Sequence, residues 1–161
     1  MSRLDLRRRR WSWYHDEQNQ QSGHFLDFVV DDTSLCDILE PGMVSQLGSK
    51  DQLLTGLLLE TPPSLSSGRY ELYGCLCGDI MCGSITVAIE RAGDRIVWKD
   101  FAHEDGEAVY KSGFGEAGPF EFEIAQYRQA LLSWPLKPES KRARKKPGLW
   151  IEGVNYDHRH R

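Results

Sequence analysis

The chain of 161 residues lacks several features that would fix its class at once. No apolar run approaches the roughly 18 residues that a membrane-spanning helix needs. The basic N-terminus is not followed by the apolar stretch of a signal peptide. Four cysteines are too few for a scaffold held by disulfides. We therefore expect a cytoplasmic protein with reduced thiols and no contact with a membrane.

Complete catalytic motifs are also missing. The sequence has no G-x-G-x-x-G loop to hold a phosphate, and no histidine stands at a spacing that would activate a cysteine. No catalytic residue is assigned, and the sequence favours a protein that is not an enzyme. A hydrophobic content of 40% and a charged content of 27% are typical of one ordinary globular domain.

Charge is distributed unevenly along the chain. Residues 11–136 carry seven basic and twenty acidic residues, whereas residues 1–10 carry five arginines and one acid. Residues 137–161 carry eight lysines or arginines against three acids. An acidic body repels nucleic acid and attracts basic partners. Any nucleic acid would have to bind the basic ends, at residues 1–10 and 137–146.

The pattern of apolar residues predicts an α+β fold with an antiparallel sheet. We expect a flexible basic and polar arm over residues 1–22, a single α+β domain over 23–136, and a basic linker and tail over 137–161. The expected elements are a strand at 24–30, short helices at 35–39 and 49–60, a central three-stranded meander at about 69–103, a strand near 119–123, a packed helix near 124–134, and a short edge strand from residue 149.

Three of the four cysteines lie in the stretch "YGCLCGDIMCGS", residues 73–84. If residues 78–81 form a four-residue hairpin turn, Cys77 faces Cys82, Cys75 faces Ser84 and Tyr73 faces Thr86. Because side chains alternate along a strand, all three cysteines then share the more polar face of the sheet.

The cysteine cluster has three interpretations, which the sequence leaves open. Cys77 and Cys82 are close enough for a disulfide if they pair directly. Alternatively, Cys75, Cys77 and Cys82 bind zinc with a fourth ligand from elsewhere in the chain, for which His103 is the best candidate, followed by His24 and Cys36. In the third interpretation, the cysteines only fill a crowded turn that is rich in glycine.

A resemblance covers residues 69–132, under half of the chain. The Cys-Gly-Asp-x-x-Cys-Gly turn that starts at Cys77, the Trp-x-Asp-Phe segment at 98–101, and the Phe-x-Phe strand with Tyr127 behind it resemble an uncharacterised family of small bacterial proteins. Many members have a further cysteine three residues before the turn, whereas Cys75 lies two before it. The resemblance implies a shared fold and no established activity.

Composition and charge together favour a non-enzymatic acidic binding protein whose partner is a basic protein. An immunity-type inhibitor of a bacterial toxin has the expected size and acidity. We expect the partner to contact acidic residues at one end of the meander: Asp79, Asp100, Glu104, Asp105 and Glu107. The alternatives are a zinc- or thiol-dependent protein that uses the cysteine cluster, and an accessory domain that binds nucleic acid through the basic ends.

Overall fold

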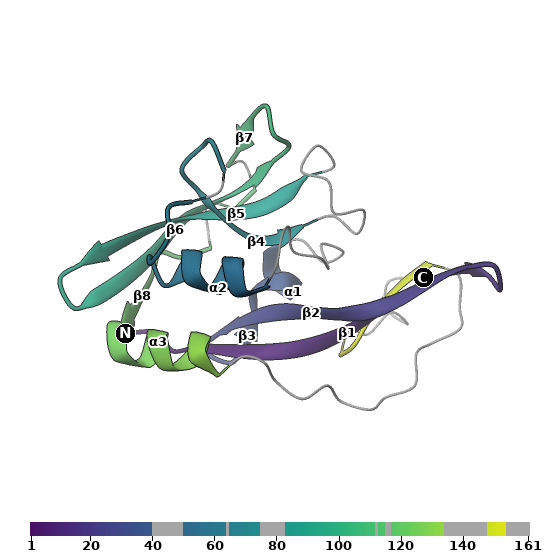
Figure 1. The fold of residues 1–161 in the computed structure, drawn as a ribbon, viewed down its shortest axis with the longest axis horizontal. Coiled ribbons are helices and arrows are strands. Elements are labelled where there is room, and N and C mark those ends of the chain that lie inside the picture. Colours follow the sequence, from purple (N-terminus) through teal and green to yellow (C-terminus); the bar gives the residue numbers. More distant parts are fainter. Residues whose placement is uncertain are drawn as a thin grey trace.

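The structure is a computed structural model of the whole chain. It describes residues 1–39, 50–63, 65–74, 83–111, 113–114, 117–133 and 148–153. These residues form two antiparallel sheets with three short helices beside them (Figure 1). One sheet has the strand order β3-β2-β1-β9, and the other has the order β4-β5-β6-β7 with β8 also paired to β6. The predicted α+β class is confirmed.

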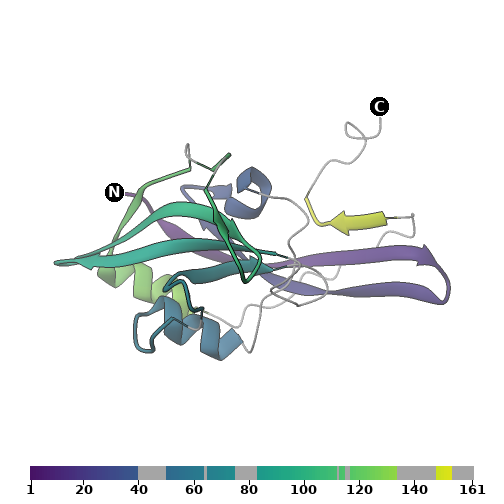
Figure 2. The same ribbon diagram turned by 90° about the horizontal axis from the view of Figure 1, so that it is seen from above.

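The first sheet is built on a long hairpin of β1 (Leu4–Asp16) and β2 (Asn19–Val30). Their register runs without a break from Leu4 opposite Val30 to Tyr14 opposite Gln20. At the tip, Asp16 Oδ1 accepts hydrogen bonds from the backbone N–H groups of Gln18 and Asn19, both at 2.9 Å. The hairpin extends well beyond the rest of the fold (Figure 2).

The hairpin corrects the prediction of a flexible arm at residues 1–22. The arginine run suggests a solvated segment, but β1 is ordered by contacts with distant parts of the chain. Leu4 and Leu6 are buried, and Arg9 is only 1% exposed. β3 (Thr33–Ser34) extends the sheet beside β2. β9 (Gly148–Ile151) pairs with β1, so the edge strand expected within the predicted tail is present.

The second sheet contains the predicted meander: β4 (Tyr70–Gly74), β5 (Ser84–Ala92) and β6 (Arg95–Glu104). β5 and β6 are joined by a two-residue turn in which Gly93 has a φ of 64°, a conformation that glycine adopts without strain. β8 (Phe120–Glu123) is the predicted fourth strand and pairs antiparallel with β6. β7 (Val109–Tyr110) was not predicted.

The register of β4 on β5 differs from the prediction. Thr86 lies opposite Glu71 instead of Tyr73, and Tyr73 lies opposite Ile85. The shift falls between Glu71 and Tyr73, where Leu72 is the extra residue of a bulge. A bulge reverses the alternation of faces, and Tyr73 consequently lies in the core. The predicted pair of Ser84 with Cys75 is also wrong, since Ser84 lies opposite Gly74. The predicted pair of Cys77 with Cys82 lies outside the described residues.

The three helices are α1 (Leu35–Leu39), α2 (Lys50–Leu57) and α3 (Ile124–Leu132), close to where the sequence predicts them. Ser34 caps α1, since its Oγ accepts a hydrogen bond from Asp37 N at 3.2 Å. α3 packs against β1, β6 and β8. Within the described residues, no helix is long and apolar enough to cross a membrane.

Trp98 of β6 joins the two sheets and α3 in one core. Its ring is fully buried and lies 5.7 Å from Phe28, 5.5 Å from Phe122 and 6.0 Å from Tyr127, all in edge-on geometry. Trp98 Nε1 donates a hydrogen bond to the Tyr127 hydroxyl at 3.2 Å, which donates in turn to the Leu57 carbonyl at 2.6 Å. Trp98 therefore packs beneath α3 at the centre of the core.

Candidate functional site

The expected functional residues divide into two groups. Cys75, Cys77, Asp79 and Cys82 lie outside the described residues. The others lie on β6 or in the turn that joins it to β7: Asp100, His103, Glu104, Asp105 and Glu107. Gly74 pairs with Ser84, which pairs with Glu104 on its other side. The two strand ends that lead into the cysteine turn thus lie at the same end of the sheet as the β6–β7 turn, as the sequence predicts.

His103 lies against the residue that directly follows Cys82. Gly83 has a φ of 113°, and a Cβ atom there would overlap the imidazole ring. Only glycine allows this close approach. Across the residues that the structure describes, no three histidine, cysteine or acidic side chains are grouped so as to hold a metal ion.

Glu104 is buried and cannot serve as an exposed contact for a partner. It is 4% exposed, and its Oε1 accepts hydrogen bonds from Ser67 Oγ at 2.8 Å and Thr86 Oγ1 at 3.2 Å. Arg69 Nε lies 3.2 Å from the same oxygen. The prediction that Glu104 contacts a partner is corrected, because its carboxylate is already bonded inside the fold.

Arg69 also bridges β5 and β6 at a point where their backbone pairing is interrupted. The pairing of β5 with β6 shifts its register between Thr86 and Ala88. Asp100, which lies on the β6 side of this shift, has a φ of 54°. The freed carbonyls of Thr86 and Asp100 both accept hydrogen bonds from Arg69 Nη2. Burial lowers the pKa of Arg69, and the charges of Glu104 and Asp100 act against this shift. The bulge is stabilised from inside, while the Asp100 side chain remains exposed.

The turn from β6 to β7 forms a surface that we call the acidic hairpin, residues 105–110. Asp105 Oδ1 accepts hydrogen bonds from the backbone N–H groups of Ala108 at 2.9 Å and Glu107 at 3.0 Å, and these bonds lower its pKa. Glu107 is exposed. Val109 and Tyr110 are 38% and 51% exposed. Carboxylates and exposed apolar side chains therefore lie side by side at the edge of the second sheet.

A buried charge network on the first sheet was missed by the sequence analysis. Asp27 is fully buried, and its Oδ2 lies 3.0 Å from Arg7 Nη2 and 3.2 Å from Arg9 Nη1. Arg9 Nη1 also lies 2.9 Å from Asp37 Oδ1, and Arg9 Nε donates a hydrogen bond to the Glu152 carbonyl at 2.6 Å. This network connects β1, β2, α1 and the end of β9.

Tyr73 completes this network from the second sheet. Its hydroxyl donates a 2.7 Å hydrogen bond to Asp27 Oδ1. Burial, and then the charge of Asp27, raise the pKa of Tyr73 well above its usual value, so it remains a donor at neutral pH. Burial alone would lower the pKa of Arg9, but Asp27 and Asp37 raise it. Arg9 and Asp27 are almost fully buried and pair with each other, while Arg9 Nη2 has no hydrogen-bond partner among the described residues. A buried charge pair with this many hydrogen bonds indicates a role in stability.

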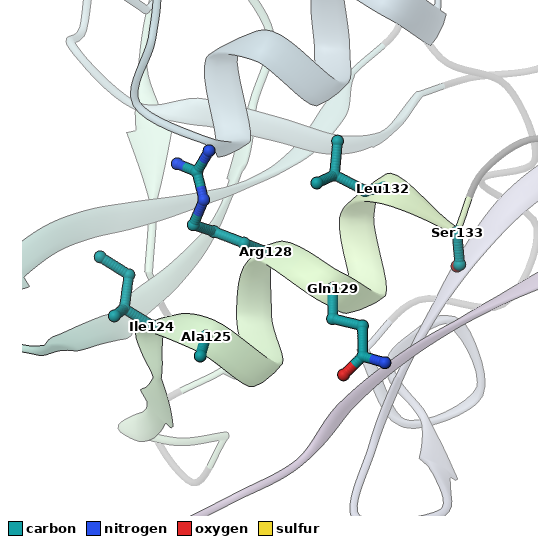
Figure 3. A pocket seen from close by; sticks show the side chains of 6 residues that line it. All are labelled: Ile124, Ala125, Arg128, Gln129, Leu132 and Ser133. Carbon is teal, nitrogen blue, oxygen red and sulfur yellow. The ribbon is translucent and has the colours of Figure 1, made fainter.

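A shallow hollow of about 740 Å³ lies over the outer face of α3 (Figure 3). In Figure 3, Arg128 and Gln129 extend from opposite sides of the helix. Arg128 is the charged residue among those that line the hollow. Its Nη2 lies 3.8 Å from Glu60 Oε1 in an exposed ion pair. The hollow therefore brings together no acid–base pair that could act on a substrate.

No family model, no curated protein and no solved structure matches this chain.

Proposed function

We propose that the protein is a non-enzymatic binding protein that holds a basic protein partner on the acidic hairpin. The observation that carries the proposal is the exposure of Val109 and Tyr110 directly beside Asp105 and Glu107. Tyrosine is frequent among the residues that dominate the energy of protein interfaces. Exposed carboxylates around such an anchor would attract a basic partner and orient it.

We propose more specifically that the protein is an immunity-type inhibitor of a bacterial toxin, and this specific function should be tested first. The acidic body between residues 11 and 136 supports it, since a toxin that acts on nucleic acid needs a basic surface. Arg7 and Arg9 face Asp27 in ion pairs, which leaves them less available to nucleic acid. The cytoplasmic location and the resemblance to the bacterial family remain predictions.

The test is capture of a partner from lysate, followed by binding kinetics over a salt series. We expect Tyr110→Ala to weaken binding by on the order of tenfold or more. Glu107→Lys should slow association and reduce its dependence on salt, because an exposed charge acts mainly on the encounter rate. Asp94→Lys is the matched control, since it makes the same charge change in the exposed turn between β5 and β6.

Three results would contradict the proposal. One is the capture of nucleic acid alone. The second is loss of capture when the lysines and arginines of residues 137–146, which precede β9, are neutralised while the hairpin variants bind normally. The third is an equal effect of Asp94→Lys and Glu107→Lys on the association rate.

A second candidate is a zinc- or thiol-dependent protein that uses Cys75, Cys77 and Cys82. The contact between His103 and Gly83 favours it, because this contact places an imidazole beside the residue that follows Cys82. If zinc is bound, purified protein should contain about one zinc per chain, and a chelator should lower its melting temperature. His103→Ala should reduce the zinc content. If the purified protein contains no metal and its thiols react slowly, the remaining interpretation is that the cysteines only fill a crowded turn.

A further inference from the structure

The acidic hairpin is held in shape by bonds within itself. Asp105 N donates a hydrogen bond to the Ala108 carbonyl at 3.4 Å, and Asp105 Oδ1 accepts hydrogen bonds from the N–H groups of Ala108 and Glu107. Aspartate is common in turns because its side chain can bond to its own backbone in this way. One carboxylate oxygen thus satisfies two backbone donors, and the turn has a defined conformation in the absence of a partner.

Tyr110 is held from two sides, although it is 51% exposed. Its hydroxyl donates a long hydrogen bond to Asp105 Oδ2, at 3.4 Å. Its ring lies 6.3 Å from the imidazole of His103, which is its direct neighbour across β6 and β7. An exposed aromatic ring whose rotation is already restricted loses little conformational entropy when a partner covers it.

The two carboxylates of the acidic hairpin are placed differently. Asp105 is partly buried, and both of its oxygens accept hydrogen bonds from the hairpin itself. Glu107 contributes its backbone N–H to these bonds, and it is exposed. A carboxylate that extends into solvent steers a charged partner more effectively than one that is already bonded within its own turn. The two residues are therefore suited to different tasks.

We propose that Asp105 is a positioning residue, which fixes the ring of Tyr110 in the conformation that a partner binds, whereas Glu107 supplies the charge that steers the partner. This inference rests on the function proposed above and divides it between the two carboxylates. Without the bonds to Asp105, a partner would have to order Tyr110 on binding, and the complex would dissociate faster. Without the charge of Glu107, the complex would instead form more slowly.

The first test uses the full chain and needs no partner. In Asp105→Ala, amide hydrogen exchange at Glu107 and Ala108 should become faster by on the order of tenfold, because both N–H groups lose a charged acceptor. The NMR signals of the Tyr110 ring should also lose their nuclear Overhauser contacts with His103. Asp105→Asn keeps an oxygen that accepts both N–H groups, so it should resemble the unaltered protein. Unchanged exchange and unchanged Tyr110 contacts in Asp105→Ala would overturn the inference, whether or not a partner is captured.

The second test measures binding kinetics with the basic protein captured as described above. Asp105→Ala and Asp105→Asn remove the same charge, so a difference between them reports the positioning alone. We expect Asp105→Ala to dissociate on the order of fivefold faster than Asp105→Asn. Glu107→Gln is the charge-matched control, and it should slow association without changing dissociation.

Thermal unfolding followed by circular dichroism checks that the three variants keep the fold. Equal dissociation rates for Asp105→Ala and Asp105→Asn would overturn the inference, as would a dissociation rate of Glu107→Gln that matches that of Asp105→Ala. If no basic protein is captured, the proposed function is wrong, and the exchange and NMR measurements still decide whether Asp105 orders Tyr110.

Discussion

Replacement of Trp98 by alanine is expected to lower the free energy of unfolding by about 3–5 kcal/mol. The indole is fully buried and contacts the rings of Phe28, Phe122 and Tyr127. These three rings come from β2, β8 and α3, so the cavity borders both sheets and the helix. The variant also removes the donor that bonds to the Tyr127 hydroxyl. Chemical denaturation monitored by circular dichroism measures the change.

Leu132→Ala is the matched control for Trp98→Ala. Leu132 lies at the end of α3, is 65% exposed, and buries little surface. Its replacement should change stability by no more than about 0.5 kcal/mol. Similar denaturation midpoints for the two variants would show that Trp98 is not at the centre of the core.

Replacement of Asp27 by alanine should cost about 3–5 kcal/mol, because it leaves a buried guanidinium without its main counter-charge. Arg9 is 1% exposed and would retain only the half-exposed carboxylate of Asp37. The hydroxyl of Tyr73 would lose its acceptor as well. Denaturation of Asp27→Ala, Arg9→Ala and the double variant should give strongly non-additive losses, since both residues belong to one network.

Asp5→Ala provides the comparison on the same hairpin. Asp5 pairs with Arg3 at 3.2 Å, but both side chains are largely exposed to solvent. Such pairs contribute about 0–1 kcal/mol. If Asp27→Ala were as mild as Asp5→Ala, the buried network would not stabilise the fold.

Local sequence patterns predicted the second sheet and the helices well. The turn at Gly93, the alternation in β8 and the apolar stripe of α3 are all signals within a few residues of one another. Trp98 and Tyr127 could be placed in the core because each occupies the apolar face of its own element. These features depend little on the rest of the chain.

The features that could not be predicted from the sequence depend on contacts between residues that are far apart in the chain. The arginine run at residues 7–10 suggests solvation, and nothing nearby indicates that Arg9 is buried against Asp27 and Asp37. Glu104 was expected to be exposed like the acidic residues beside it. Its burial could not be foreseen, because its partner Arg69 is 35 positions earlier in the chain. The bulge at Leu72 has no turn residue to mark it, and the register error moved Tyr73 to the wrong face.

The hydrogen bond from Arg9 to the Glu152 carbonyl joins residues 143 positions apart, which has a consequence for synthesis on the ribosome. β1 and β2 are adjacent in the chain and can pair as soon as both have emerged. The partner for the outer edge of β1 is translated much later. Until then, the edge of β1 that later receives β9 is unpaired, and the guanidinium of Arg9 lies beside it with Asp27 of β2 as its counter-charge. Charges at such edges oppose association with other chains. The same guanidinium would thus protect the nascent hairpin from aggregation before it stabilises the finished fold.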